Sequence, residues 1–221
     1  MKKMQPGFTL VEIAIVLVII GLLLGGVLKG QELVNSAKVK SLINDFRSIS
    51  SFVHAYQDRF RALPGDDRSA ATHLNGGTRA TTPDEAQGNA RINGNWNSTI
   101  TTDESFLFWQ HVRLAGLATG TPDVDSDDYL PRNAEGGRIG ITGEAILGSS
   151  SLSTAPYPAS FYVCSQGIQG RHARQIDTTI DDGNTQTGSV RAITDGAVKV
   201  DNADNVTAAD DAKSYTVCMA F

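Results

Sequence analysis

The sequence is poor in the residues that build reactive or metal-binding centres. Two cysteines in 221 residues are too few for a four-cysteine zinc site or a disulfide-dense scaffold. The four histidines, His54, His73, His111 and His172, do not follow metal-ligand spacing, and no Gly-x-Ser-x-Gly, Walker or dinucleotide-binding motif occurs. We therefore name no catalytic residue, and a membrane-anchored periplasmic enzyme remains a remote alternative.

The chain also lacks an excess of basic residues. It has 19 Lys and Arg against 24 Asp and Glu, for a formal net charge of −5. Coating a nucleic acid requires clustered positive charge, so no nucleic-acid partner is expected. Apolar residues make up 40% of the chain, which is enough for a packed core, but they are unevenly placed.

The largest apolar run covers residues 8–28, where 16 of 21 positions are apolar and three are glycine. As a helix this run is about 30 Å long, the thickness of a bilayer core. A cleaved secretory signal peptide would need a small-residue cleavage site of the A-x-A kind. The sequence after Leu28 offers none in a suitable position, so the run predicts a retained membrane helix.

Glu12 is the one charged residue inside this run. A carboxylate near the centre of a membrane helix costs on the order of 3 kcal/mol, and less near an end. No lysine or arginine lies in the run, so a partner must come from elsewhere. The alternatives are that Glu12 stays neutral or reaches the membrane interface.

The N-terminus resembles the class III leader of type IV prepilins and of type II secretion pseudopilins. The resemblance is carried by Lys2 and Lys3, by the segment Gly7-Phe8-Thr9-Leu10-Val11-Glu12, and by the apolar run that follows. It implies that residues 1–7 are a leader, that a prepilin peptidase cuts between Gly7 and Phe8, and that the new amine of Phe8 is methylated.

The resemblance also implies a function. The protein would be a structural, non-enzymatic subunit of a type IV pilus or pilus-like filament, in which Glu12 pairs with the Phe8 amine of a neighbouring subunit. Its precursor would cross the bacterial inner membrane once, with a periplasmic head, and would meet an assembly platform and other pilins there. A pseudopilin of a type II secretion system is the alternative. Many major pilins carry a proline near the position of Lys29, and this chain has no proline in residues 8–63.

Residues 29–63 continue the helical pattern as an amphipathic segment. Apolar residues step by three and four positions, a spacing typical of one helix face. They are Val39, Leu42, Phe46, Ile49, Val53, Tyr56, Phe60 and Leu63. A coiled coil and a core helix both fit such a stripe, and the globular region that follows favours the core helix. Pro64-Gly65 then predicts the end of the helix.

Residues 64–221 are expected to form the head, which makes the chain an α+β protein. Residues 64–102 are rich in Gly, Asn, Thr and Asp and predict a long irregular connection. Helices are expected over 103–117 and around 173–180. Four short strands of an antiparallel sheet are expected at 138–142, 160–164, 189–194 and 215–220.

Two features of the head suggest a cation site and a cross-link. Asp123, Asp125 and Asp127 alternate as in the start of an EF-hand loop, but the required glycine and glutamate are absent, so the choice is between a looser calcium site and a solvated acidic loop. By the resemblance to pilins, Cys164 and Cys218 form a disulfide, with two free buried thiols as the alternative. No other cofactor is expected.

Overall fold

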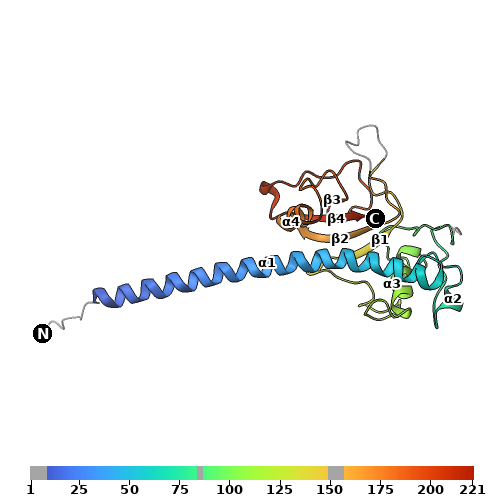
Figure 1. The fold of residues 1–221 in the computed structure, drawn as a ribbon, viewed down its shortest axis with the longest axis horizontal. Helices are drawn as coiled ribbons and strands as arrows, with labels where there is room; N and C mark the ends of the chain where they lie inside the picture. Colours follow the sequence, from blue (N-terminus) through green and yellow to red (C-terminus); the bar gives the residue numbers. More distant parts are fainter. Residues whose placement is uncertain (1–8, 84–86, 149–156) are drawn as a thin grey trace. The chain divides into compact units, whose positions relative to one another are not determined.

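The computed structural model describes residues 9–83, 87–148 and 157–221 (Figure 1). In chain order its elements are α1 (Leu10–Phe60), α2 (Ala70–His73), α3 (Glu104–Leu114), β1 (Ile139–Thr142), β2 (Tyr162–Gln169), α4 (Gly170–Ile180), β3 (Val190–Thr194), the short 3₁₀ helix η1 (Ala208–Asp210) and β4 (Ser214–Ala220). A long N-terminal helix with a small antiparallel sheet confirms the expected α+β class.

The chain divides into two compact units, one ending at Lys38 and the other running from Val39 to Phe221. α1 therefore supplies its first part to one unit and its second part to the other. The second part of α1 belongs to the same unit as the head, because its apolar stripe lies in the head's core.

The stripe on the second part of α1 is buried as its periodicity predicts. Leu42, Val53 and Tyr56 are fully buried, while Phe60 and Leu63 remain partly exposed. The helix ends at Phe60, three residues before the expected end, because Arg61 adopts a left-handed conformation with φ of 56°. Such a residue cannot continue a right-handed helix.

The four strands form one antiparallel sheet in the order β1-β2-β4-β3. Because successive side chains in a strand point to opposite faces, each strand contributes to two cores. Val163 and Val217 pack with the stripe of α1 on one face, whereas Cys164 and Cys218 pack with Trp96 on the other. β2 extends to Gln169, five residues beyond the expected end, and contains an irregularity between Ser165 and Ile168.

The long connection between α1 and α3 is held mainly by buried polar side chains. The Asp66 carboxylate accepts backbone hydrogen bonds from Gly88, Asn89 and Ala90, and Asp67 accepts one from the Tyr56 hydroxyl at 2.7 Å. Both carboxylates are 2% exposed. Asp66 thereby joins two stretches of the connection to each other, and Asp67 fixes the connection to α1.

The turn after α1 is built around a glycine. Gly65 has φ of +93°, and a Cβ there would lie 2.3 Å from the carbonyl oxygen of Glu104. The Gly65 amide donates a 2.9 Å hydrogen bond to Nδ1 of His111, whose Nε2 donates to the Thr78 carbonyl at 2.7 Å. His111 is completely buried, so the helix turn and α3 meet in a closed contact.

Candidate functional site

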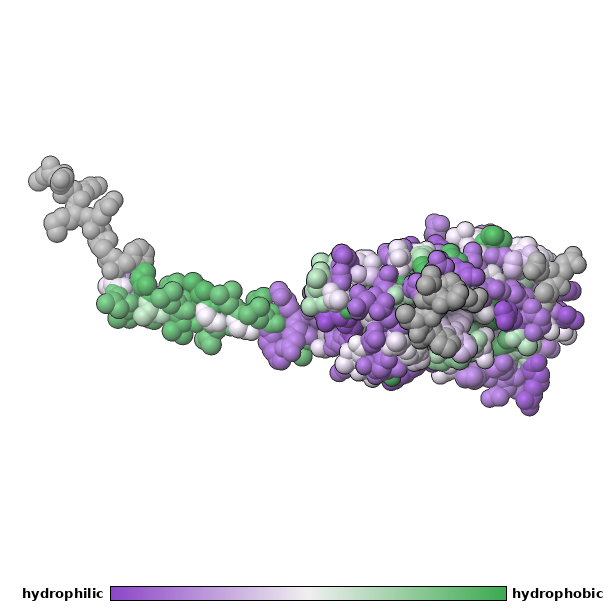
Figure 2. All heavy atoms as spheres, turned by 90° about the horizontal axis from the view of Figure 1, so that it is seen from above, coloured by the Kyte–Doolittle hydropathy of each residue, from purple (hydrophilic) through white to green (hydrophobic). Residues whose placement is uncertain are grey.

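The first part of α1 is the most unusual surface of the protein, because it is apolar and exposed. Leu17, Leu22 and Leu28 are 63%, 73% and 67% exposed. Figure 2 shows the hydrophobic colour gathered over this part of the helix. Among the described residues one helix, α1, is long and apolar enough to cross a membrane, and none of its most apolar window is buried.

Glu12 lies at the start of this surface and caps the helix. Its Oε2 accepts hydrogen bonds from the Thr9 amide at 2.8 Å and the Thr9 hydroxyl at 2.7 Å. The Glu12 amide in turn donates to the Thr9 hydroxyl at 3.3 Å. Since α1 begins at Leu10, Thr9 is the N-cap residue and Glu12 is the third residue of the helix. Their reciprocal hydrogen bonds are those of a capping box.

The capping box is a role for Glu12 that our sequence analysis missed. The Thr-x-x-Glu spacing before an apolar run is a known signal for it, but the membrane cost of the carboxylate drew attention to an external partner instead. The cap supplies two hydrogen bonds to Glu12 within its own chain. It leaves the charge of the carboxylate uncompensated, because both Thr9 donors are neutral.

Gly7 and Phe8, the expected cleavage and methylation residues, lie outside the described residues. The pairing of Glu12 with the Phe8 amine of a neighbour would form between two subunits, and the structure describes one. Both remain predictions, to which the structure adds one fact. The Glu12 carboxylate already bonds to the amide of Thr9, the residue next to Phe8.

Cys164 and Cys218 form a disulfide in the structure. The two residues are directly opposite each other on β2 and β4, with their Cα atoms 4.1 Å apart. Both are completely buried in the core on the sheet face away from α1. The cross-link implied by the resemblance therefore joins the two central strands of the sheet.

The alternating aspartates are exposed side chains of one loop. Among the described residues, Asp123, Asp125 and Asp127 are not among the carboxylates whose ligand atoms lie within 4.8 Å of one another. The Asp125 amide instead donates to the Asp123 carboxylate at 3.1 Å, in an exposed turn. This geometry favours the solvated acidic loop.

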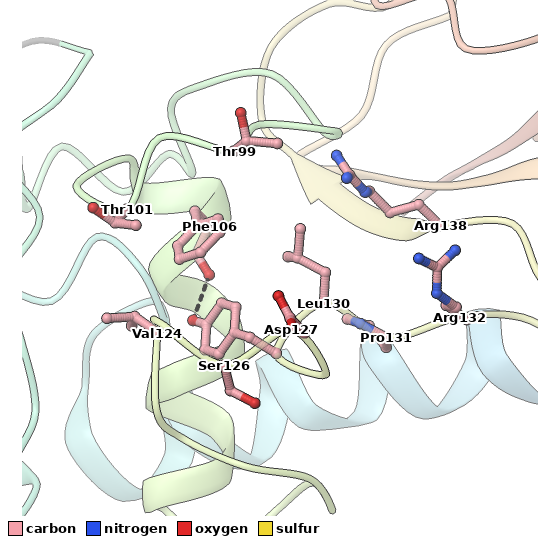
Figure 3. A pocket seen from close by; sticks show the side chains of 11 residues that line it. Thr99, Thr101, Phe106, Val124, Ser126, Asp127, Leu130, Pro131, Arg132 and Arg138 are labelled. Carbon is pink, nitrogen blue, oxygen red and sulfur yellow. Dashed lines mark hydrogen bonds between the residues drawn. The ribbon is translucent and has the colours of Figure 1, made fainter.

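Asp127 also shares a cavity with two arginines. It lines a cavity of about 320 Å³ together with Arg132 and Arg138 (Figure 3). Two guanidinium groups in the same cavity oppose the binding of a cation. The hydroxyl side chains of Thr99, Thr101 and Ser126 also line the cavity.

The two buried histidines have structural partners. His111 fixes the turn at Gly65, and burial lowers the pKa of its imidazole, in keeping with a neutral ring that accepts at Nδ1. His172 is bonded through Nδ1 to the Glu135 carboxylate, which joins α4 to the loop before β1. Neither histidine is grouped with other metal-ligand side chains in the described part of the chain.

Comparison with known families supports the reading of the N-terminus. Residues 2–28 match the family described as the prokaryotic N-terminal methylation motif. The match covers Gly7, Phe8 and Glu12 together with the whole apolar run, as a class III leader of the pilin and pseudopilin kind requires. No curated protein and no solved structure matches the chain.

Proposed function

We propose that this protein is a structural subunit of a type IV pilus or pilus-like filament, inserted in the membrane as a precursor and assembled through the first part of α1. The observation that carries the proposal is the methylation motif at residues 2–28, which coincides with an exposed apolar helix. A surface of this kind needs lipid before assembly and neighbouring subunits afterwards.

In this proposal the leader peptidase converts Phe8 into the N-terminus and so creates a cation at the start of an apolar helix. Glu12 provides the matching negative charge on another subunit. Two opposite charges that enter an apolar filament core together offset each other's desolvation, whereas either one alone is costly. The pairing thus selects subunits that have been cleaved.

The head has the character of a stable, extracytoplasmic domain in this proposal. Its disulfide suits an oxidising compartment, and the fixed connection between α1 and α3 gives it a defined surface. The same features fit a pseudopilin of a type II secretion system. Surface pili that contain this chain would favour the pilus, and a filament confined to the periplasm would favour the secretion system.

Processing is tested by the intact mass of the protein recovered from membranes or filaments. The expected mass is that of a chain beginning at Phe8 with one methyl group on its amine. A Gly7→Val variant is the control and is expected to keep residues 1–7. Recovery of the wild-type chain with its leader intact would contradict the proposal.

The role of Glu12 is tested with two variants that separate charge from helix capping. Glutamine also serves at this position of a capping box, so Glu12→Gln keeps the cap and removes the charge, while Glu12→Ala removes both. If charge pairing drives assembly, both variants give cleaved subunits and few or no filaments, since an unpaired buried charge costs roughly 3–5 kcal/mol. Normal filaments from Glu12→Gln and few from Glu12→Ala would make capping the reason for Glu12.

A further inference from the structure

A second acidic group, distant in sequence from the aspartates at 123–127, lies at the end of α4. One carboxylate oxygen each from Asp177, Asp181 and Asp182 lies within 4.8 Å of the others. Oxygens that bind one Ca²⁺ at 2.3–2.6 Å lie at most about 5 Å apart, so a single ion can contact all three. Acidic clusters on a surface are common without an ion, so the distances alone decide nothing.

Asp177 supplies the observation that indicates a ligand. Its side chain is completely buried, and neither carboxylate oxygen has a hydrogen-bond partner among the described residues. The Gly183 amide is close enough to act on the charge, but it lies outside hydrogen-bond geometry. A buried carboxylate without partners is costly, and the cost is removed when a cation or a proton binds to it.

The position of Asp177 in the fold makes the negative charge still more unfavourable. Asp177 lies in the last turn of α4, at the negative end of the helix dipole, and this turn contains no basic residue. The carboxylates of Asp181 and Asp182 lie beside it and add two more acidic groups. The electrostatic field at this point therefore attracts positive charge.

The other two carboxylates are held in place by the loop between α4 and β3. Asp181 accepts the Val190 amide at 3.0 Å, and Asp182 accepts the Asn184 amide at 2.9 Å and the Thr187 hydroxyl at 2.6 Å. The ligand atoms are thus fixed before an ion binds, which lowers the cost of ordering the loop.

Arg191, in the part of the chain that the structure describes, is a cation that acts on this group. It interacts electrostatically with Asp181 and Asp182. Its guanidinium carbon lies 4.3 Å from the centre of the Tyr157 ring. One guanidinium against three carboxylates leaves a net negative charge, and the oxygens of Asp177 are still without a partner.

We propose that Asp177, Asp181 and Asp182 form a binding site for one Ca²⁺, which fixes the C-terminal end of α4 to the start of β3. Carboxylate oxygens are hard ligands that suit Ca²⁺ and Mg²⁺. Mg²⁺ usually keeps several waters and demands near-octahedral geometry, whereas Ca²⁺ accepts irregular protein ligands, so a buried aspartate favours Ca²⁺. With few protein ligands the affinity should be that of extracellular modules, with Kd on the order of 1 mM.

The test is a thermal unfolding titration of the full-length protein in detergent after removal of metal with EGTA. At about 10 mM CaCl₂ the wild-type Tm is expected to rise by about 3–6 °C, saturably and more than with MgCl₂. Asp177→Asn should abolish the rise, and Asp123→Asn, in the exposed acidic loop, should keep it.

The design also covers a variant that fails to fold and a site that holds only a proton. Asp182 is exposed, so Asp182→Asn should fold. This variant should need at least about tenfold more CaCl₂ than the wild type for the same rise in Tm. A wild-type Tm that does not change with CaCl₂, or an equal rise in Asp177→Asn, would overturn the proposal. The outcome does not depend on whether the protein assembles into filaments.

Discussion

The two parts of α1 contain the same kinds of apolar residue in opposite environments. Leu17 and Leu22, in the first part, are 63% and 73% exposed, whereas Leu42 and Val53, in the second, are completely buried. Apolar residues surround the first part on all sides over residues 13–28, and on the second part they form one stripe opposite a charged face. A helix that is apolar all round needs a surrounding apolar medium, while a stripe needs one partner surface.

The head buries its apolar residues within a single chain, and the first part of α1 does not. Leaving a Val or Leu side chain in water instead of burying it costs about 1.5–3 kcal/mol. The head meets this requirement with its own sheet and helices, so its stability should depend on its own core. The first part of α1 has no such partner in its own unit and should contribute to assembly rather than to the folding of the head.

The largest effect is expected from truncation of the buried stripe. Phe46→Ala should lower the free energy of unfolding of the head by about 3–5 kcal/mol, since Phe46 is 1% exposed and packs in the main core. Leu17→Ala is the matched control in the first part of α1 and should leave it unchanged. Denaturant titration in detergent measures both, and a comparable loss in the two variants would remove the distinction between the parts.

The disulfide should stabilise the head alone. Cys164 and Cys218 are 54 residues apart, and a closed loop of this size is worth about 4 kcal/mol in chain-entropy estimates and often less in practice. The double variant Cys164→Ala/Cys218→Ala should lose roughly 2–4 kcal/mol in head unfolding. The helical signal of the first part of α1 should not change, and its joint loss with the head would show that the two parts fold as one.

The same two parts show what the sequence can and cannot predict. α1 and the four strands were predicted within a few residues at most ends, because periodicity and glycine-rich turns are local signals. The stripe from Val39 to Tyr56 was predicted to be in the core for the same reason. Prediction of the helix end erred by three residues because the left-handed conformation of Arg61 is not specified by its residue type.

Polar interactions between distant segments were not predictable in this way. Asp66 and Asp67 lie in a segment that was predicted to be a long irregular connection, yet both are buried with partners up to 24 residues away. Asp177 was placed in a short helix without a role, while the aspartates at 123–127 had the more suggestive spacing. Convergence of carboxylates depends on how α4 and β3 pack, and spacing along the chain does not encode it.

A smaller effect is expected from Glu104, which lies completely buried at the start of α3. Burial raises the pKa of its carboxyl to about 7, with Asp66 and Asp103 adding to the effect against the Asn93 amide. The folded state thus holds this proton more tightly than the unfolded chain. The resulting stabilisation is present below about pH 4.5 and is lost as the pH rises through about 7.

Glu104→Gln should remove this pH dependence of the unfolding free energy, because glutamine keeps the shape without the charge. At about pH 8, where Glu104 is charged, the variant should be more stable than the wild type by roughly 1–3 kcal/mol. Glu32→Gln, at an exposed position of α1, should leave the pH dependence unchanged. Unfolding free energies measured from about pH 5 to pH 8 compare the three proteins. Superimposable profiles for wild type and Glu104→Gln would contradict the assignment.

The smallest effect concerns the cap of the first part of α1. Thr9→Ala removes the hydroxyl that bonds both to the Glu12 carboxylate and to its amide, at a local cost of about 0.5–2 kcal/mol. Faster amide hydrogen exchange is expected in the first helical turn, with no change in the melting of the head. Unchanged exchange in that turn would show that the cap does not stabilise the helix.

The difference between the two parts of α1 is tested most directly by photo-crosslinking from one site in each part. A benzophenone side chain replaces Leu17 in one protein and the exposed Ser41 in the other. We predict that position 17 crosslinks to lipid in isolated membranes and to a second copy of the chain in assembled filaments, with little of either from position 41. Crosslinks from position 17 to the head of its own chain, before and after assembly, would contradict the account.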